Sequence, residues 1–285
     1  MTDAKPICTP MSTTCSLDTN DDTPSYDSSS FHSLIGSLHY LSLTWSDVAF
    51  VVNKLSQYMQ APSSIHMQAL ERILRYLKHT IFHDLYLVAT KNLDLTAFCD
   101  ADWGGDNFDR KSTSAYIVYL GPNVISWSCK KKSTVARSST EVEYHTIETT
   151  MSKLLWIQQL LMELGIQIPK RPNIFSDNIS ATYLCENSVF HSQMKHLSID
   201  YHFGRDIIAK CELTVSHVPS SHQLATKPLS RSQHDFLVSK IGVVDHSSIL
   251  WGHIGTSTCA GNAAPWFSPS ALHSSTGYLF KILHN

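Results

Sequence analysis

The chain has little charge and no strong excess of either sign. Charged residues make up 16% of its 285 residues, and the formal net charge is −2 at pH 7. A chain with this balance has no overall basic field to attract nucleic acids or anionic membranes. It contains no run of about 18 apolar residues, which argues against a membrane span. Its N-terminus lacks the charged and apolar stretches of a secretory signal. We therefore expect a cytoplasmic or nuclear protein without a membrane partner.

Several motifs of cofactor and metal chemistry are also missing. The seven cysteines are scattered, without a Cys-x-x-Cys pair or a zinc-type Cys/His cluster, so we expect reduced thiols and no structural zinc. No glycine-rich loop of the phosphate-binding type occurs. No histidine lies at motif spacing from Ser138 or Ser139, so neither serine has the sign of an activated nucleophile. We expect no small-molecule cofactor.

Composition and periodicity divide the chain into four segments. Residues 1–30 are rich in Ser, Thr, Asp and Pro, which predicts a polar leader or linker. Residues 31–90 carry apolar residues at helical spacing and predict a small helical region. Residues 91–244 alternate between strand and helix patterns. Residues 245–285 have only two formal charges and no clear periodicity, which predicts a weakly structured tail.

The third segment predicts an α/β fold of the mixed α+β kind. A first strand ends at Asp100, a β-rich hairpin turns at residues 121–123, and a long helix runs from about Ser139 to Leu164, with Gly165 as its C-cap. The later elements are strand 173–176, helices 181–186 and 195–210, strand 212–218 and helix 232–240. This order predicts a mixed five-stranded sheet with flanking helices.

Acidic motifs stand at strand ends and helix starts in this segment. Asp100 ends the first strand, Glu143 lies near the start of the long helix, and Asp177 follows a later strand. Carboxylates gathered from separate segments repel one another unless a cation lies between them, and hard oxygen ligands suit Mg²⁺ or Mn²⁺. The pattern predicts a metal-dependent phosphodiester hydrolase with these three residues as catalytic metal ligands. Of the neighbouring Asp100 and Asp102, we expect only one to face the metal.

Capping is the structural alternative for the other two acids. Ser138-x-x-Glu141 and Thr140-x-x-Glu143 both fit a capping box at a helix start. If Ser138 caps the helix, Glu141 closes the box and Glu143 is free to face the sheet. We therefore favour Glu143 as the ligand. Asp177 can cap the next helix as well as bind a metal, and the two roles can coexist.

A basic strip follows the acidic stretch. Between Lys111 and Arg137 the chain carries five positive charges and no acid. Lys130, Lys131, Lys132 and Arg137 are candidate contacts for nucleic-acid phosphates. Their alternative role is that of a solvated face at the end of a hairpin.

Longer stretches of sequence around these acids resemble one family. They are Ser33-Leu34-Ile35-Gly36-Ser37-Leu38-His39-Tyr40-Leu41, Arg72-Ile73-Leu74-Arg75-Tyr76-Leu77-Lys78, Ala136-Arg137-Ser138-Ser139-Thr140-Glu141, Ser176-Asp177-Asn178 and Lys195-His196-Leu197-Ser198-Ile199-Asp200-Tyr201-His202-Phe203. Together they resemble the C-terminal part of Copia-type retrotransposon Pol polyproteins, from the end of the reverse transcriptase through the ribonuclease H domain. The resemblance covers about Lys5 to Val243.

The resemblance implies a ribonuclease H fold that cuts the RNA strand of an RNA–DNA hybrid. Two Mg²⁺ or Mn²⁺ ions about 4 Å apart would activate a water and stabilise the leaving 3′ oxygen. In that scheme Asp100 lies between both ions, while Glu143 and Asp177 hold one of them. The hybrid would be recognised by groove shape, phosphates and ribose 2′-hydroxyls. The other implied partner is the rest of a Pol polyprotein in an intact element.

The chain departs from the family pattern at one expected ligand. Where the family has Gln-Leu-Ala-Asp, two apolar residues and Thr-Lys-Pro-Leu, this chain reads Gln223-Leu224-Ala225-Thr226-Lys227-Pro228-Leu229. The fourth metal-binding Asp is missing, and His222 and Asp235 are the candidates to replace it. The reverse-transcriptase aspartate pair is also absent, so no polymerase activity is expected. We predict an impaired ribonuclease H. The alternative is a catalytically dead remnant that binds hybrid or RNA.

Overall fold

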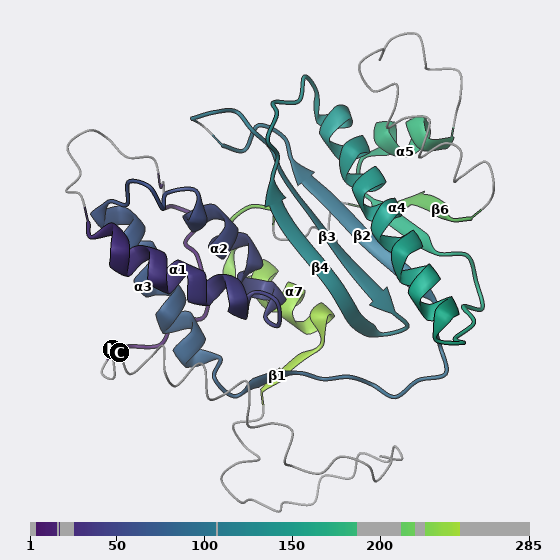
Figure 1. Cartoon of the computed structure of the whole chain (residues 1–285), viewed down its shortest axis with the longest axis horizontal. Coiled ribbons are helices and arrows are strands. Elements are labelled where there is room, and N and C mark those ends of the chain that lie inside the picture. The colour runs from purple at the N-terminus through teal and green to yellow at the C-terminus, as the bar shows by residue number, and fades with distance from the viewer. Residues whose placement is uncertain are drawn as a thin grey trace, which may run out of the picture.

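The computed structural model describes residues 4–15, 17, 26–106, 108–186, 212–219 and 226–245. A group of helices lies beside a twisted sheet, and a long helix crosses the sheet (Figure 1). The helix expected at residues 195–210, the candidate ligand His222 and the predicted tail beyond residue 245 lie outside the described residues.

The helical region consists of α1 (Ser28–Leu41), the short 3₁₀ helix η1 (Ser46–Val48), α2 (Ala49–Ser56) and α3 (Ser64–His79). The start of α1 is capped by Asp27, whose carboxylate accepts hydrogen bonds from the amides of Ser29 and Ser30. Apolar residues at helical spacing on α1 are buried in a shared core, among them Phe31 and Ile35. The core therefore forms between the apolar faces that the sequence periodicity predicts.

Part of the N-terminal segment packs against these helices. The side chains of Met11 and Leu17 are buried in the helical core. Basic side chains of α3 donate hydrogen bonds to the same segment: Arg72 to Thr9, Arg75 to Lys5 and Lys78 to Ala4. The described part of the segment expected as a polar leader thus contributes apolar side chains to the core.

The sheet contains β2 (Leu95–Asp102), β3 (Thr113–Leu120), β4 (Asn123–Lys131), β5 (Asn173–Ser176) and β6 (Thr214–His217). Their spatial order is β4-β3-β2-β5-β6. The first three strands form an antiparallel meander, whereas β5 pairs in parallel with β2, and β6 in parallel with β5. The predicted mixed five-stranded sheet is confirmed.

Helices pack on both faces of this sheet. On one face, α4 (Ser139–Glu163) and α5 (Ile179–Glu186) pack over buried residues of β2 such as Leu95 and Ala97. On the other face, α7 (Arg231–Ile241) packs over β3 residues such as Ile117. This division follows from the alternation of side chains along each strand. None of the described helices is long and apolar enough to cross a membrane.

The sheet and the helical region are joined by contacts that periodicity did not predict. Strand β1 (His83–Leu85), after α3, pairs antiparallel with β7 (Val243–Asp245), after α7. The indole of Trp127 on β4 donates a hydrogen bond to the carbonyl of Ser42 at 2.9 Å. The two three-residue strands are too short to show alternation in the sequence. As a result, the segment after α7, at the end of the sheet region, pairs with the segment after α3, at the end of the helical region.

Candidate metal centre

Parallel pairing of β2 with β5 brings two of the predicted ligands to the same end of these neighbouring strands. Phe98 on β2 lies opposite Phe175 on β5 in the register of this pair. Asp100 and Asp177 each stand two residues beyond these partners. Because the strands run in the same direction, both carboxylates emerge at the same end. This strand pairing therefore places Asp100 and Asp177 close to each other.

The third carboxylate comes from the first turns of α4. Ser138 caps this helix by accepting a hydrogen bond from the amide of Glu141 at 3.2 Å. The carboxylate of Glu141 accepts from the amide of Arg137 at 2.8 Å, one residue before the predicted partner in a capping box. Glu143 is only 4% exposed, and its Oε1 accepts a hydrogen bond from the amide of Ala101 at 3.1 Å. Glu141 therefore acts at the helix end, and Glu143 points inward.

The N-terminus of α5 is capped by Asn178, the residue after Asp177. The Oδ1 of Asn178 accepts a hydrogen bond from the amide of Ala181 at 3.0 Å. The expected double role of Asp177 as cap and ligand is therefore not needed, because Asn178 performs the capping.

The three predicted ligands meet. One carboxylate oxygen from each of Asp100, Glu143 and Asp177 lies within 4.8 Å of the other two. The Oε2 of Glu143 is buried without a hydrogen-bond partner among the described residues. Burial, with the nearby charge of Asp100, raises the pKa of Glu143 to about 8, and burial raises the pKa of Asp100 to about 6. One buried and two half-buried acids, with one buried oxygen that lacks a hydrogen-bond partner among the described residues, form a donor set that fits a divalent cation.

Asp102 stays outside this group, as expected for one of the two neighbouring acids. Its carboxylate lies against the backbone of Gly105, where an added Cβ would stand 1.8 Å from Asp102 Oδ2. A side chain at position 105 would therefore require the carboxylate of Asp102 to move. Burial raises the pKa of Asp102 above its usual value.

A hydroxyl approaches the cluster from the segment that lacks the fourth aspartate. The Oγ1 of Thr226 donates a hydrogen bond to Asp100 Oδ2 at 2.9 Å, and Thr226 is 3% exposed. The suggestion that Asp235 replaces the missing ligand was wrong. Asp235 is outside the cluster, its side chain is 61% exposed, and it pairs with Arg231 on α7.

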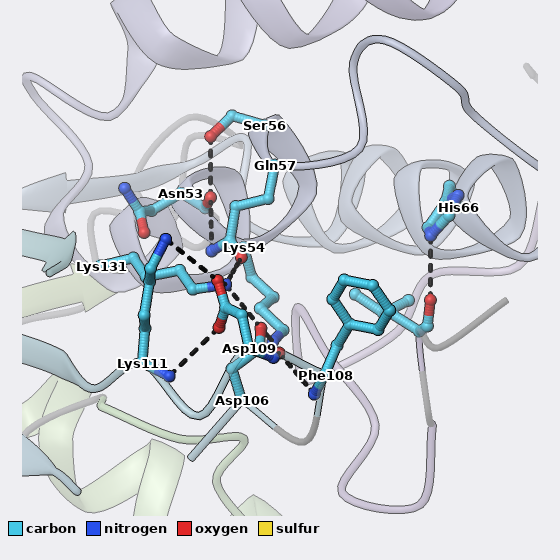
Figure 2. A network of polar contacts seen from close by, with 11 residues as sticks. Asn53, Lys54, Ser56, Gln57, His66, Asp106, Phe108, Asp109, Lys111 and Lys131 are labelled. Carbon is cyan, nitrogen blue, oxygen red and sulfur yellow. Dashed lines mark hydrogen bonds and ion pairs between the residues drawn. The ribbon is translucent and has the colours of Figure 1, made fainter. Parts of the chain in front are cut away.

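The predicted basic strip divides into residues with different surroundings. Lys130 and Arg137 are exposed and Lys132 is half-buried. The ammonium group of Lys131 contacts Asp106 Oδ2 at 2.8 Å and Asp109 Oδ2 at 3.0 Å, so a phosphate would have to compete with two carboxylates (Figure 2). The structure therefore gives Lys131 an internal role and does not support it as a phosphate contact.

Sequence reasoning missed two features near the cluster. One is the contact between Thr226 and Asp100, which lie 126 residues apart. The other is the pairing of Asp106 with Lys54, which lie 52 residues apart. The only local signal for Asp106 was its place among the aspartates of a turn-rich stretch, and nothing nearby indicated its partner.

Comparison with known proteins identifies the chain. No family model matches it. It is 49% identical to the retrovirus-related Pol polyprotein from transposon RE1 of Arabidopsis thaliana, over 85% of this chain and 17% of that protein. The corresponding polyprotein from transposon RE2 of the same plant is also 49% identical, over 86% of this chain and 17% of that protein. The chain belongs to the retrotransposon Pol polyproteins.

This confirms the predicted family resemblance. A more distant relative, the Pol polyprotein from transposon TNT 1-94 of Nicotiana tabacum, is 30% identical over 85% of this chain and 19% of its own length. The chain therefore spans less than a fifth of the length of these Pol polyproteins.

Solved structures similar to this Pol segment include LC11-RNase H1, with a TM-score of 0.37 and 12% identity over 53% of this chain and 96% of that one. Another is the foamy viral protease-reverse transcriptase in complex with RNA/DNA hybrid, with a TM-score of 0.41 and 15% identity over 74% of this chain and 27% of that one. The sheet of the Pol segment, with its antiparallel meander and two parallel strands, has the ribonuclease H-like fold.

Proposed function

We propose that this Pol segment is a metal-dependent ribonuclease H that hydrolyses the RNA strand of RNA–DNA hybrids, with a site weakened by loss of one carboxylate. The observation that carries the proposal is the convergence of Asp100, Glu143 and Asp177 within 4.8 Å. Carboxylates at this separation, one buried and two half-buried, repel one another when ionised unless a cation joins them. Membership of the Pol polyproteins supports the choice of reaction.

Asp100, Glu143 and Asp177 would hold Mg²⁺ or Mn²⁺. A bound ion would supply charge stabilisation at the phosphoryl oxygens and a more acidic bound water. The protein orients the ligands through neighbouring groups. The amide of Ala101 holds one oxygen of Glu143, and the hydroxyl of Thr226 holds one oxygen of Asp100. Such outer contacts set the direction and basicity of the ligating oxygens.

Weak activity follows from the chemistry of Thr226. Its hydroxyl is neutral and donates its hydrogen to Asp100, so it adds no negative charge to the cluster. A fourth carboxylate would add both charge and an oxygen ligand. With three acids, binding of a second ion should be weaker than binding of the first. We therefore expect slow cleavage that depends strongly on the divalent ion.

The substrate would be held mainly through its backbone. Lys130 and Arg137 are the exposed members of the predicted basic strip. Charge contacts of this kind position a nucleic acid without reading its sequence. Preference for RNA in the cleaved strand would come from contacts to ribose 2′-hydroxyls.

The test is cleavage of a fluorescently labelled RNA–DNA hybrid by the full chain, in Mg²⁺ and separately in Mn²⁺. The full chain is used because Met11 and Leu17 belong to the helical core. Asp177→Asn is the control, since Asn178 caps α5 and the substitution leaves that cap in place. We expect slow cleavage of the RNA strand that Asp177→Asn abolishes, and no cleavage of duplex DNA.

Two results would overturn the proposal. Cleavage unchanged by Asp177→Asn would mean that the acids do not form the active site. Binding of the hybrid without cleavage in either ion would leave the chain as a binding remnant of a Pol polyprotein. A melting curve for each variant shows whether the folded state is retained.

A further inference from the structure

The loop between β2 and β3 begins directly after Asp102, next to the carboxylate cluster. Backbone and side-chain hydrogen bonds connect the described residues of this loop, 103–106 and 108–112, to one another. The amide of Gly104 donates to Ser112 Oγ at 3.1 Å, and the amide of Arg110 donates to the carbonyl of Asp106 at 3.0 Å. The described part of the loop therefore has a defined conformation at the edge of the site.

Asp106 ties this loop to two other elements. Its carboxylate is buried and accepts hydrogen bonds at 2.8 Å from Lys54 of α2 and from Lys131 of β4 (Figure 2). Its second oxygen accepts from the amide of Phe108 at 2.9 Å. Although burial opposes ionisation, the two lysines hold the pKa of Asp106 well below its usual range. The loop is thus held as a preformed surface.

This loop presents two large side chains to solvent. Phe108 is 93% exposed, and Trp103 is 52% exposed. The indole N–H of Trp103 donates to the carbonyl of Ala136, before α4, at 3.0 Å, so its ring is already oriented. Arg110 is exposed on the same loop and has a φ of 55°, a backbone conformation that residues other than glycine rarely adopt. Exposed aromatic rings and a strained residue together are typical of a binding loop.

Charge identifies the class of partner. The acids of the loop, Asp106 and Asp109, are compensated: Asp106 by Lys54 and Lys131, and Asp109 by Lys131 at 3.0 Å and Lys111 at 3.4 Å. A polyanion can therefore approach the loop without meeting uncompensated carboxylates there, and Arg110 adds a positive charge. Aromatic rings beside positive charge suit nucleic acids, because bases and sugars stack on the rings while phosphates contact the cations.

We infer that the described residues of this loop are a nucleic-acid contact of this Pol segment, with Trp103 and Phe108 packing against bases or sugars of the hybrid and Arg110 contacting its backbone. This inference rests on the proposed function, because the loop begins beside the proposed cleavage site. It adds binding residues that lie outside the carboxylate cluster and the basic strip. Asp106 has a positioning role, since it acts through the conformation of the loop.

The experiment measures binding of a labelled RNA–DNA hybrid to the full chain by fluorescence anisotropy. Ca²⁺ replaces Mg²⁺ to slow cleavage. Trp103→Ala and Phe108→Ser are compared with Trp156→Ala. Trp156 is a matched control because it is 57% exposed and the Nζ of Lys153 lies 4.0 Å from the centre of its ring. It stands 13 residues beyond Glu143, which is about 20 Å along α4. We expect Kd to rise about tenfold for each loop variant, as for loss of one stacked base, and to stay unchanged for Trp156→Ala.

Kinetics in Mg²⁺ provide the second readout. The loop variants should raise KM while leaving kcat near that of the wild type, because they remove binding without touching the ligands. Trp103→Phe keeps a ring and should recover most of the affinity. Melting temperatures check that the variants fold; both side chains are exposed, so we expect little change.

The outcomes separate the two proposals. If the wild type binds and cleaves the hybrid and the loop variants have the same Kd and KM as Trp156→Ala, the loop inference alone is wrong. If the wild type neither binds nor cleaves the hybrid, the proposed function is wrong and this inference fails with it. Loss of affinity for single-stranded RNA alone, with hybrid binding intact, would also contradict the assignment to hybrid.

Discussion

Asp100 and Asp106 stand six residues apart along the chain and lie in two carboxylate groups with opposite electrostatics. Asp106 is buried between the ammonium groups of Lys54 and Lys131. Asp100 is half-buried beside two further acids, of which Glu143 is buried and keeps one oxygen without a partner among the described residues. Accordingly, the pKa of Asp106 is held low despite its burial, whereas burial raises the pKa of Glu143 to about 8.

The two groups differ in whether the protein itself compensates the charge of the carboxylates. A buried carboxylate that is paired with lysines has its charge compensated within the protein, so it can hold elements together. Carboxylates that are gathered with only the partial compensation that the charge of Lys227 gives to Asp100 keep an unfavourable energy, which an external ion can relieve. The chain thus has one acidic group that lysines compensate by direct contact and one carboxylate cluster whose chemistry fits a divalent cation.

Removal of an acid from the uncompensated cluster should have the largest effect. Glu143→Gln is expected to lower hybrid cleavage by about 10²- to 10³-fold, because an ionised ligand of the proposed metal ion is lost. The same substitution should raise the stability of the metal-free protein at pH 8, since it removes an unfavourable buried charge. Glu141→Gln, two residues earlier in the same helix, is the control and should retain activity. Equal losses in the two variants would contradict the assignment.

Breaking the compensated cluster should instead reduce stability. Asp106→Asn leaves Lys54 and Lys131 without a carboxylate at 2.8 Å, and we expect it to lower the free energy of unfolding by about 2–3 kcal/mol. Urea denaturation measures this change. Asp109→Asn is the matched control: its side chain is 28% exposed, so it should cost less than about 1 kcal/mol. A similar cost for both would mean that Asp106 is not the centre of the network.

The pH dependence of stability provides a third comparison. Burial raises the pKa of Glu143 from 4.5 to about 8 and that of Asp100 from 3.8 to about 6. Between the unfolded and folded values, the folded state binds more protons than the unfolded state, so metal-free stability falls as pH rises from about 4 to 8. Mg²⁺ binds the ionised acids and should offset this loss. We expect Mg²⁺ to raise Tm by about 3–6 °C at pH 8.5 and by almost nothing at pH 5.

Thermal unfolding at both pH values, with and without Mg²⁺, tests this expectation. Glu143→Gln should flatten the metal-free dependence, because it removes the group with the larger shift. An equal Mg²⁺ effect at pH 5 and pH 8.5 would indicate ion binding elsewhere on the protein.

Local patterns in the sequence predicted most of the fold and named the three acids that lie close together in the structure. The alternation before Asp100 and the helix start after Ser138 are short-range signals that the structure confirms, although β2 continues two residues beyond the expected end, to Asp102. The pairing of β1 with β7 could not be predicted, because three-residue strands show no periodicity. Nor could the contacts of Asp106 and Thr226, whose partners lie far away in the chain and are decided by packing. Long-range polar contacts leave no pattern in neighbouring residues.

Thr226 permits the finest comparison, because it brings an internal group to the uncompensated cluster without adding a cation. Thr226→Val keeps the shape of the side chain but removes the hydrogen bond to Asp100 Oδ2. Loss of a contact that orients a ligand should weaken Mn²⁺ binding by about threefold to tenfold, as measured by calorimetry. Thr226→Ser retains the hydroxyl and should restore the affinity. If both variants bind Mn²⁺ as the wild type does, Asp100 is oriented by the strand and its pairing alone, and the hydroxyl only satisfies a buried oxygen.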